Sequence, residues 1–148
     1  MSERREVAST LEFPYQRSAG DVMGAFFQGL REQRITGIRT PSGDVLVPPL
    51  EFDPATGASV DPTPVDVGPG GEVTTWTWVD APGADHPLDR PFAFALIRLD
   101  GATTALTHVV DAGDRARMQT GMRVTASWRA EREARITDIE AFVPEVQA

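Results

Sequence analysis

The sequence predicts a mainly β protein in which one N-terminal helix precedes a small five-stranded Greek-key barrel. Near the N-terminus, apolar residues recur at helical spacing. From residue 72 onward, apolar and polar residues alternate in short runs bounded by turn residues. Residues 35–71, between these two parts, are rich in proline and glycine and carry only short apolar pairs. An open five-stranded sandwich is the alternative arrangement of the same strands.

Length and composition favour a single domain and exclude several kinds of chemistry. The chain has 148 residues, of which 41% are hydrophobic, and it contains no cysteine. The lack of cysteine excludes zinc–thiolate, iron–sulfur, dithiol and cysteine-nucleophile sites. The net charge of -8, from 14 basic and 22 acidic residues, argues against nucleic acid as a partner.

Residues 1–17 are predicted to form a charged N-terminal arm. No apolar signal-peptide core follows it, and no apolar run reaches the roughly 18 residues that a membrane span needs. We therefore expect a cytoplasmic protein without a membrane partner.

The spacing of apolar residues predicts a helix over residues 18–34, capped by Ser18 or Asp21. Its apolar residues are Val22, Met23, Phe26, Phe27 and Leu30. Gly24 and Gly29 each cost about 1 kcal/mol inside a helix, so this helix needs a packing partner. That partner is either the rest of this chain or another protein. Phe26, Phe27 and Leu30 are accordingly candidate partner-binding residues.

Five strands are predicted in the second half of the chain, over residues 73–79, 92–99, 103–110, 122–130 and 135–143. Asp100 and Gly101 predict a tight hairpin between the second and third strands. The apolar residues of the last strand change parity, which predicts a β-bulge near Thr137 and Asp138. Short strands with a longer connection over 111–121 are typical of an OB-type barrel, here residues 72–143 with a tail over 144–148.

Other side chains allow both a functional and a structural interpretation. Trp76 and Trp78 share one strand face, where they either fill the barrel core or offer a surface to a partner. His86 is expected in an exposed loop, and His108 in a strand as a core or edge residue. Four arginines are candidates for contact with the phosphates of an acyl-CoA, or else are solvated or paired with acids: Arg31, Arg34, Arg115 and Arg117.

No catalytic motif stands out in the sequence. It has no G-x-S-x-G, no GxxxxGK[ST] and no G-x-G-x-x-G motif, and its two histidines have no ligand spacing. No nucleophile, base and oxyanion donor can be assembled from the pattern. The residues by themselves therefore favour a binding or scaffold module over an enzyme.

Residues 39–57 read RTPSGDVLVPPLEFDPATG. The spacing of glycine and proline in this segment, together with the order of the predicted parts of the chain, resembles that of a known family. Its members are acyl-CoA-associated proteins, once a domain-of-unknown-function family, that join a rubredoxin-like zinc ribbon to an OB fold. Their ribbon has the form C-x-x-C-G-x-x-x-x-P-P-x-x-x-C-P-x-C-G. The frame is kept here at Gly43, Pro48, Pro49, Pro54 and Gly57. The four ligand positions hold Arg39, Ser42, Asp53 and Thr56, so the resemblance implies a ribbon over residues 35–71 that has lost its zinc site.

Shorter matches extend this resemblance to residues 18–143. They are Pro91-Phe92, Leu99-Asp100-Gly101 and Gly121-Met122-Arg123-Val124. The resemblance implies a non-catalytic scaffold subunit that binds and stabilises a thiolase-superfamily enzyme of the lipid-transfer or sterol-carrier type. The complex would act on acyl-CoA thioesters in a retro-aldolase or thiolase step of steroid side-chain or lipid catabolism. The chain itself would bind no cofactor, and a two-plus-two hetero-tetramer is expected.

Three other functions remain open at this stage. The first is a free-standing acyl-CoA or lipid-binding module, which would need an apolar pocket of its own. The second is a module that binds single-stranded nucleic acid, which the net charge of the chain opposes. The third is a small independent enzyme, for which the sequence offers no set of catalytic residues.

Overall fold

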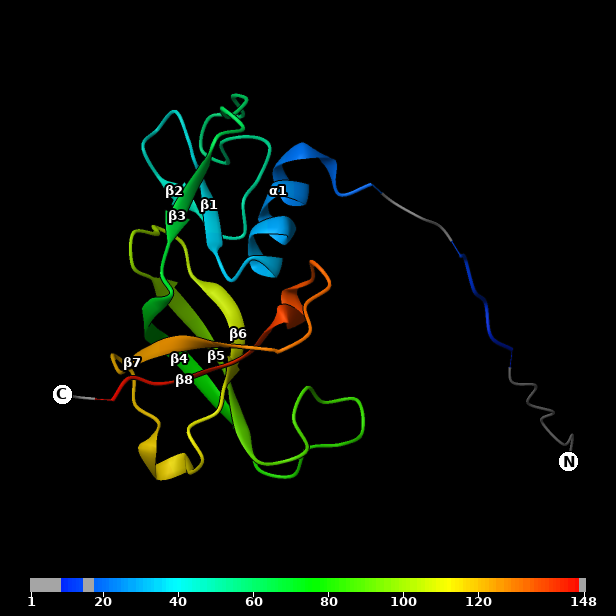
Figure 1. Cartoon of the computed structure of the whole chain (residues 1–148), viewed down its shortest axis with the longest axis vertical. Coiled ribbons are helices and arrows are strands. Elements are labelled where there is room, and N and C mark those ends of the chain that lie inside the picture. Colours follow the sequence, from blue (N-terminus) through cyan, green and yellow to red (C-terminus); the bar gives the residue numbers. More distant parts are fainter. Residues whose placement is uncertain (1–8, 15–17, 147–148) are drawn as a thin grey trace, which may run out of the picture.

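The computed structural model describes residues 9–14 and 18–146. Its elements form two layers stacked along the long axis of the molecule, as Figure 1 shows. A helix and a three-stranded sheet occupy one end, and a closed five-stranded barrel occupies the other. The predicted fold class, mainly β with an N-terminal helix and an OB-type barrel, is confirmed.

The single α-helix, α1, spans Gly20–Arg31 and is shorter at both ends than the predicted 18–34. The Ser18 hydroxyl accepts a hydrogen bond from the Gly20 amide (3.3 Å). At the other end Gln33 adopts a φ of 61°, and the Arg34 amide donates to the Gly29 carbonyl (2.8 Å). A Cβ on Gly29 would lie 3.0 Å from the Arg34 carbonyl oxygen, so this glycine lets the chain turn back against the helix.

The small sheet is built from β1 (Ile35–Arg39), β2 (Val45–Leu46) and β3 (Pro64–Val67), in the order β2-β1-β3. Both pairings are antiparallel. The proline-rich segment therefore contains more regular structure than its composition indicated. The reason is long-range pairing of β1 with β3, which leaves no periodic pattern in so short a strand.

The barrel contains β4 (Gly70–Val79), β5 (Phe92–Leu99), β6 (Leu106–Val110), β7 (Arg123–Trp128) and β8 (Ile139–Pro144). It is closed in the order β4-β5-β6-β8-β7, so the open-sandwich alternative is wrong. The predicted hairpin follows β5, where Gly101 has a φ of 87° and the Ala102 amide donates to the Leu99 carbonyl. A 3-10 turn, η1 (Arg115–Arg117), lies in the connection between β6 and β7.

The last strand differs from its prediction. Residues 136–138 form a 3-10 turn, η2 (Ile136–Asp138), where a bulged strand was expected. The buried Asp138 carboxylate accepts the amides of Glu133 (2.9 Å) and Arg135 (3.2 Å), and these bonds bend the chain before β8 begins. The register shift of β8 against β7 falls two residues later, at Glu140, because Ser127 pairs with Ala141 and Trp128 with Ile139.

One hydrophobic core runs through both layers. Phe26 and Leu30 of α1 belong to the same buried cluster as barrel residues such as Val73, Ile97 and Phe142. The helix and small sheet therefore close one end of the barrel, and the two layers share one packed interior.

Candidate functional site

An exposed region with several apolar side chains lies between α1 and the loop over residues 49–52. A groove of about 630 Å³ there is lined by Met23 and Phe27 of the helix and by Leu50 and Phe52 of the loop. Leu50 is 41% exposed and Phe52 is 52% exposed. Met23 and Phe27 are one turn apart and lie beside the buried stripe of the helix, so α1 has a second apolar side. We call this region the helix groove.

The described part of the N-terminal arm, which precedes the helix groove in the sequence, also carries exposed apolar side chains. Leu11 is 79% exposed and Phe13 is 73% exposed. Residues 9–14 extend away from the body of the molecule (Figure 1), while Ser18 already lines the groove. Exposed apolar residues gathered in this way are typical of protein interaction sites.

The structure separates the five predicted partner-binding residues. Phe26 (1% exposed) and Leu30 (0% exposed) are buried in the chain's own core, so the expectation that they form an exposed docking face is wrong. The rest of this chain is the packing partner that the helix needs. Phe27 stays partly exposed, with its ring centroid 5.6 Å from that of Phe26, and it alone of the three can meet a partner.

Trp76 and Trp78 lie on the core side of β4. They pair across the sheet with Ala95 and Ala93, whose small side chains leave room for the indole rings. Both rings are partly buried and pack against the main core. Their positions agree with the interpretation that both indole rings belong to the barrel core. A role of Trp76 and Trp78 in partner binding stays a prediction.

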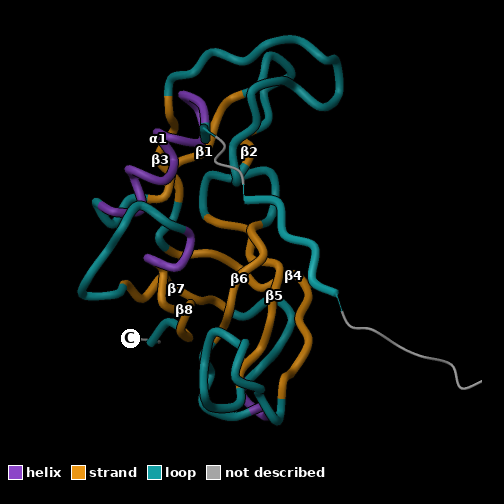
Figure 2. Tube along the Cα trace, turned by 90° about the vertical axis from the view of Figure 1, so that its right-hand side faces the viewer, coloured by secondary structure: helices purple, strands orange, loops and turns teal. Residues whose placement is uncertain are grey.

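The four candidate arginines do not converge. Arg31 and Arg34 lie at the end of α1, whereas Arg115 and Arg117 lie in η1 at the opposite end of the molecule (Figures 1 and 2). Arg34 already forms ion pairs with Asp66 (2.8 Å) and Glu32 (3.7 Å). These side chains cannot hold one phosphate group together, and contact of any of them with an acyl-CoA stays a prediction.

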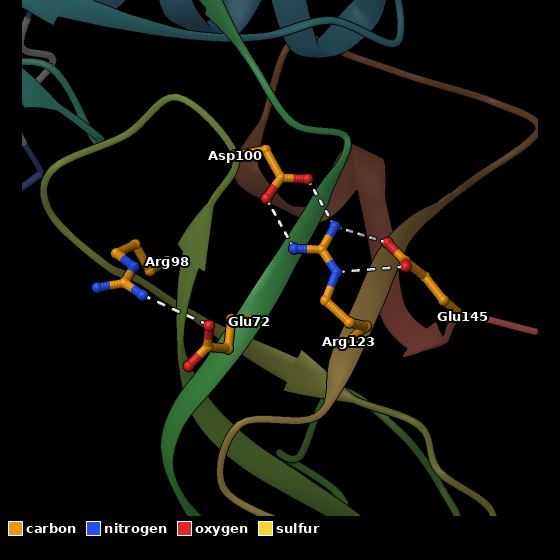
Figure 3. A network of polar contacts seen from close by, with 5 residues as sticks. All are labelled: Glu72, Arg98, Asp100, Arg123 and Glu145. Carbon is orange, nitrogen blue, oxygen red and sulfur yellow. Dashed lines mark hydrogen bonds and ion pairs between the residues drawn. The ribbon is translucent and has the colours of Figure 1, made fainter. Parts of the chain in front are cut away.

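A separate arginine network ties the barrel strands together (Figure 3). The Arg123 guanidinium of β7 donates to both carboxylate oxygens of Asp100 (2.6 and 2.7 Å) and to Glu145 (3.0 Å). These contacts hold the pKa of Asp100 below its ordinary value. Arg98 pairs with Glu72 nearby (3.4 Å). Because three carboxylates outnumber the two guanidinium groups, this network is structural and offers no anion site.

Of the four positions where the resembling family has zinc ligands, Ser42, Asp53 and Thr56 lie together, with the Asp53 carboxylate between the other two. Asp53 is 1% exposed, and its two oxygens accept hydrogen bonds from the amides of Ser42 (3.2 Å) and Ala55 (2.8 Å). Hydrogen bonding, first from Ser42, lowers the pKa of Asp53. Asp53 thus joins the turn after β1 to the loop over 53–57, the two segments that a metal would join.

These donors do not fit a zinc ion. Tetrahedral structural zinc needs four thiolate, imidazole or carboxylate donors, whereas the Arg39 guanidinium is a cation with no lone pair to offer. Ser42 and Thr56 supply only hydroxyls. No cluster of three or more His, Asp or Glu side chains suited to a metal occurs within residues 9–14 and 18–146.

Neither histidine is placed as a catalytic base. His86 is exposed, and its Nδ1 accepts the Gly83 amide (2.7 Å). His108 lies in β6, where its Nε2 is 3.3 Å from the Ile136 carbonyl oxygen. Burial lowers the pKa of His108. Neither ring contacts a hydroxyl nucleophile or an orienting carboxylate in the described part of the chain.

No helix among the described residues has the length and apolar character needed to cross a membrane.

Comparisons with known proteins place this geometry in context. A family model described as the C-terminal OB-fold domain of ChsH2 matches residues 64–129, from the start of β3 to just past the end of β7. No match was found among curated proteins.

Two solved structures are similar over most of the chain. One, described as an Ltp2-ChsH2(DUF35) aldolase, is 20% identical with a TM-score of 0.63, and the match covers 91% of this chain and 100% of that chain. The other, a protein of unknown function from the DUF35 family of Sulfolobus solfataricus, is 16% identical with a TM-score of 0.62. That match covers 82% of this chain and 81% of the other. At these identities the two structures establish a shared fold.

Proposed function

We propose that this chain is a non-catalytic subunit of a thiolase-like enzyme complex, because residues 64–129 match the family model of the ChsH2 C-terminal OB-fold domain, in line with the sequence resemblance. Its role is to bind and stabilise the partner subunit, which holds the catalytic residues. The observation that carries the proposal is the match along the whole length of the ChsH2(DUF35)-type chain, which includes the helix and small sheet as well as the barrel.

The surface of the chain supports this role. Two of its exposed large apolar side chains, Leu50 and Phe52, line the helix groove. Two more, Leu11 and Phe13, lie in the arm that precedes the helix in sequence. A few large side chains that become buried near the centre of a protein interface supply much of its binding energy. We propose that the partner covers the helix groove, with Phe27 at its base.

The finer assignment rests on the resemblance. We propose a partner of the lipid-transfer or sterol-carrier type, acting on acyl-CoA thioesters in a retro-aldol or thiolase step of steroid side-chain or lipid catabolism. The coenzyme A thioester is then a substrate of the complex, and the chain holds no cofactor of its own. Two copies of each subunit are expected, since closed symmetric assemblies prevail among soluble oligomers.

Reconstitution tests the proposal. The full chain is mixed with a thiolase-superfamily protein encoded beside it, and the mixture is analysed by size-exclusion chromatography with light scattering. The expected result is a stable equimolar complex that cleaves acyl-CoA thioesters faster than either subunit alone. A monodisperse chain that forms no complex but binds acyl-CoA by itself would favour the free-standing binding module.

A further inference from the structure

The barrel contains an open seam between β6 and β8. These two strands form a single parallel bridge, between Val110 and Phe142. On the N-terminal side of that bridge, β6 and β8 do not pair, and the residues that precede β8 form η2 instead of extending the strand. In the gap the His108 Nε2 faces the Ile136 carbonyl oxygen (3.3 Å). The seam is thus a place where the barrel wall is formed by side chains.

A pocket of about 190 Å³ lies over this seam. Its floor is formed by β5 and β6, and its two walls by the loop over residues 80–91 and the connection over residues 129–138. Side chains that line it include Pro87, Phe94, Thr107, Val109, Ile136 and Thr137. OB folds commonly use the face of their second and third strands, between these same two connections, to hold ligands.

The pocket walls are preformed. Leu88 of the long loop packs with Phe92, Val109 and Ala141 in a second buried cluster on the outside of the barrel. The His86 ring adds an edge contact to Phe92, with 5.9 Å between centroids. The opposite wall is fixed by the buried Asp138, which accepts two amides of its own loop. A ligand would therefore pay little ordering cost on entry.

The polar groups of the pocket suit an uncharged ligand. Thr107 and Thr137 are exposed and line the space, so their hydroxyls, which make no side-chain hydrogen bond to the described residues, can exchange water for a ligand hydroxyl. Arg129 and Glu140 line it as well, and their opposite charges give no net attraction for an ion. The His108 ring is neutral at pH 7 because burial lowers its pKa.

We propose that this seam pocket binds a small neutral molecule consisting of one apolar ring with a hydroxyl group. The size supports a single ring, because an apolar cavity of about 150 Å³ already accommodates benzene. The ring would lie against Phe94, Val109 and Ile136, and its hydroxyl would bond to a threonine of the wall. This site is separate from the helix groove and does not depend on the proposed partner.

The test uses the full isotopically labelled chain, titrated with phenol and followed by nuclear magnetic resonance. The expected result is a saturable set of amide shifts at Thr107, Val109 and residues 136–139. Toluene, which lacks the hydroxyl, should bind about 2- to 12-fold more weakly if one hydrogen bond is lost.

Matched variants locate the site. Thr107→Trp places an indole over the floor and should abolish the shifts, whereas Thr120→Trp, at an exposed threonine before β7 that does not line the pocket, should preserve them. If Thr107→Trp proves unfolded, Thr137→Trp blocks the pocket from the other wall. Shifts that do not saturate, or that survive both blocking variants, would overturn the proposal. Since no partner is present, this outcome is independent of complex formation.

Discussion

At the scale of single residues, Asp53 is the most informative side chain. It occupies a position where the resembling family has a zinc ligand, yet it does not act as one. Its carboxylate joins two turns directly by accepting amides from Ser42 and Ala55. A charge-assisted hydrogen bond to a backbone amide is stronger than a neutral one, which suits a carboxylate to this bridging position.

We predict that Asp53→Asn lowers the melting temperature at neutral pH, because the side-chain NH2 of asparagine would replace one accepting oxygen and face a backbone N–H donor. The folded-state pKa of Asp53 lies below the ordinary value of an aspartate. The carboxylate therefore stabilises the fold above that value, and the contribution is lost as pH falls through the lower folded pKa. Thermal melts of both proteins between neutral and acidic pH measure this difference.

Asp44→Asn is the control for this measurement, since Asp44 lies in the same turn but is exposed. It should leave the melting temperature and its acid dependence unchanged. Equal melting temperatures for Asp53→Asn and the unaltered protein at neutral pH would show that the carboxylate does not join the turns.

At the scale of elements, α1 has two apolar sides with different tasks. Phe26 and Leu30 point into the shared core, whereas Met23 and Phe27 line the helix groove. Sequence periodicity groups all of them in one broad stripe. Only the packing of the helix on the small sheet divides that stripe into a buried and a partly open half.

Substitutions at the adjacent phenylalanines should therefore separate stability from binding. Phe26→Ala should cost about 3–5 kcal/mol of unfolding free energy, since it removes a fully buried ring. Phe27→Ser should cost much less but weaken the complex with the thiolase-like partner. Urea unfolding and size-exclusion binding assays measure the two effects. A loss of stability at Phe27 as large as that at Phe26 would identify both rings as core.

The connection between β7 and β8 holds the end of α1 against the barrel. Arg132 donates from Nε to the Arg31 carbonyl at the end of α1 (2.8 Å) and from Nη1 to the carbonyls of Arg129 (2.6 Å) and Ala130 (3.1 Å). A cation at the C-terminal end of a helix also interacts favourably with the helix dipole. Arg132 thus links the helix to the barrel.

We predict that Arg132→Met, which keeps the aliphatic stem, lowers the unfolding free energy by about 1–3 kcal/mol. Arg129→Met is the control, because no side-chain hydrogen bond of Arg129 occurs among the described residues. Urea denaturation of both variants tests the difference, and indistinguishable midpoints would contradict the link.

At the scale of the whole molecule, the continuous core makes the helix, small sheet and barrel depend on one another. Val45, Val47 and Val67 of the small-sheet layer pack in the same cluster as the barrel strands. The hydroxyls of Thr103 and Thr104, in the hairpin after β5, bond to Val45 and Val47 (2.9 and 2.8 Å). The layers are thus joined by packing and by hydrogen bonds.

We expect the chain to unfold in one cooperative transition, with coincident midpoints from tryptophan fluorescence and circular dichroism. A metal chelator should leave that midpoint unchanged, because packing and Asp53 provide what zinc provides in a metal ribbon. A chelator-sensitive midpoint, or separate transitions for the two layers, would contradict this account.

Much of the architecture followed from local pattern. Alternation of apolar residues located all five barrel strands, helical spacing located α1, and Asp100-Gly101 located the hairpin, since periodicity and turn chemistry depend on neighbouring residues alone. The ribbon frame of glycines and prolines predicted the layer that caps the barrel. Composition argued against a nucleic-acid partner, and the missing cysteines excluded thiolate chemistry.

Tertiary structure alone decided the rest. It buried Phe26 and left Phe27 partly exposed, placed the candidate arginines at opposite ends of the molecule, and turned Asp53 into a bridge between two loops. It also opened the seam pocket between β6 and β8, whose lining comes from four separate segments. Exposure, convergence and cavities depend on which distant segments meet, and a sequence pattern describes only the local preferences from which those meetings arise.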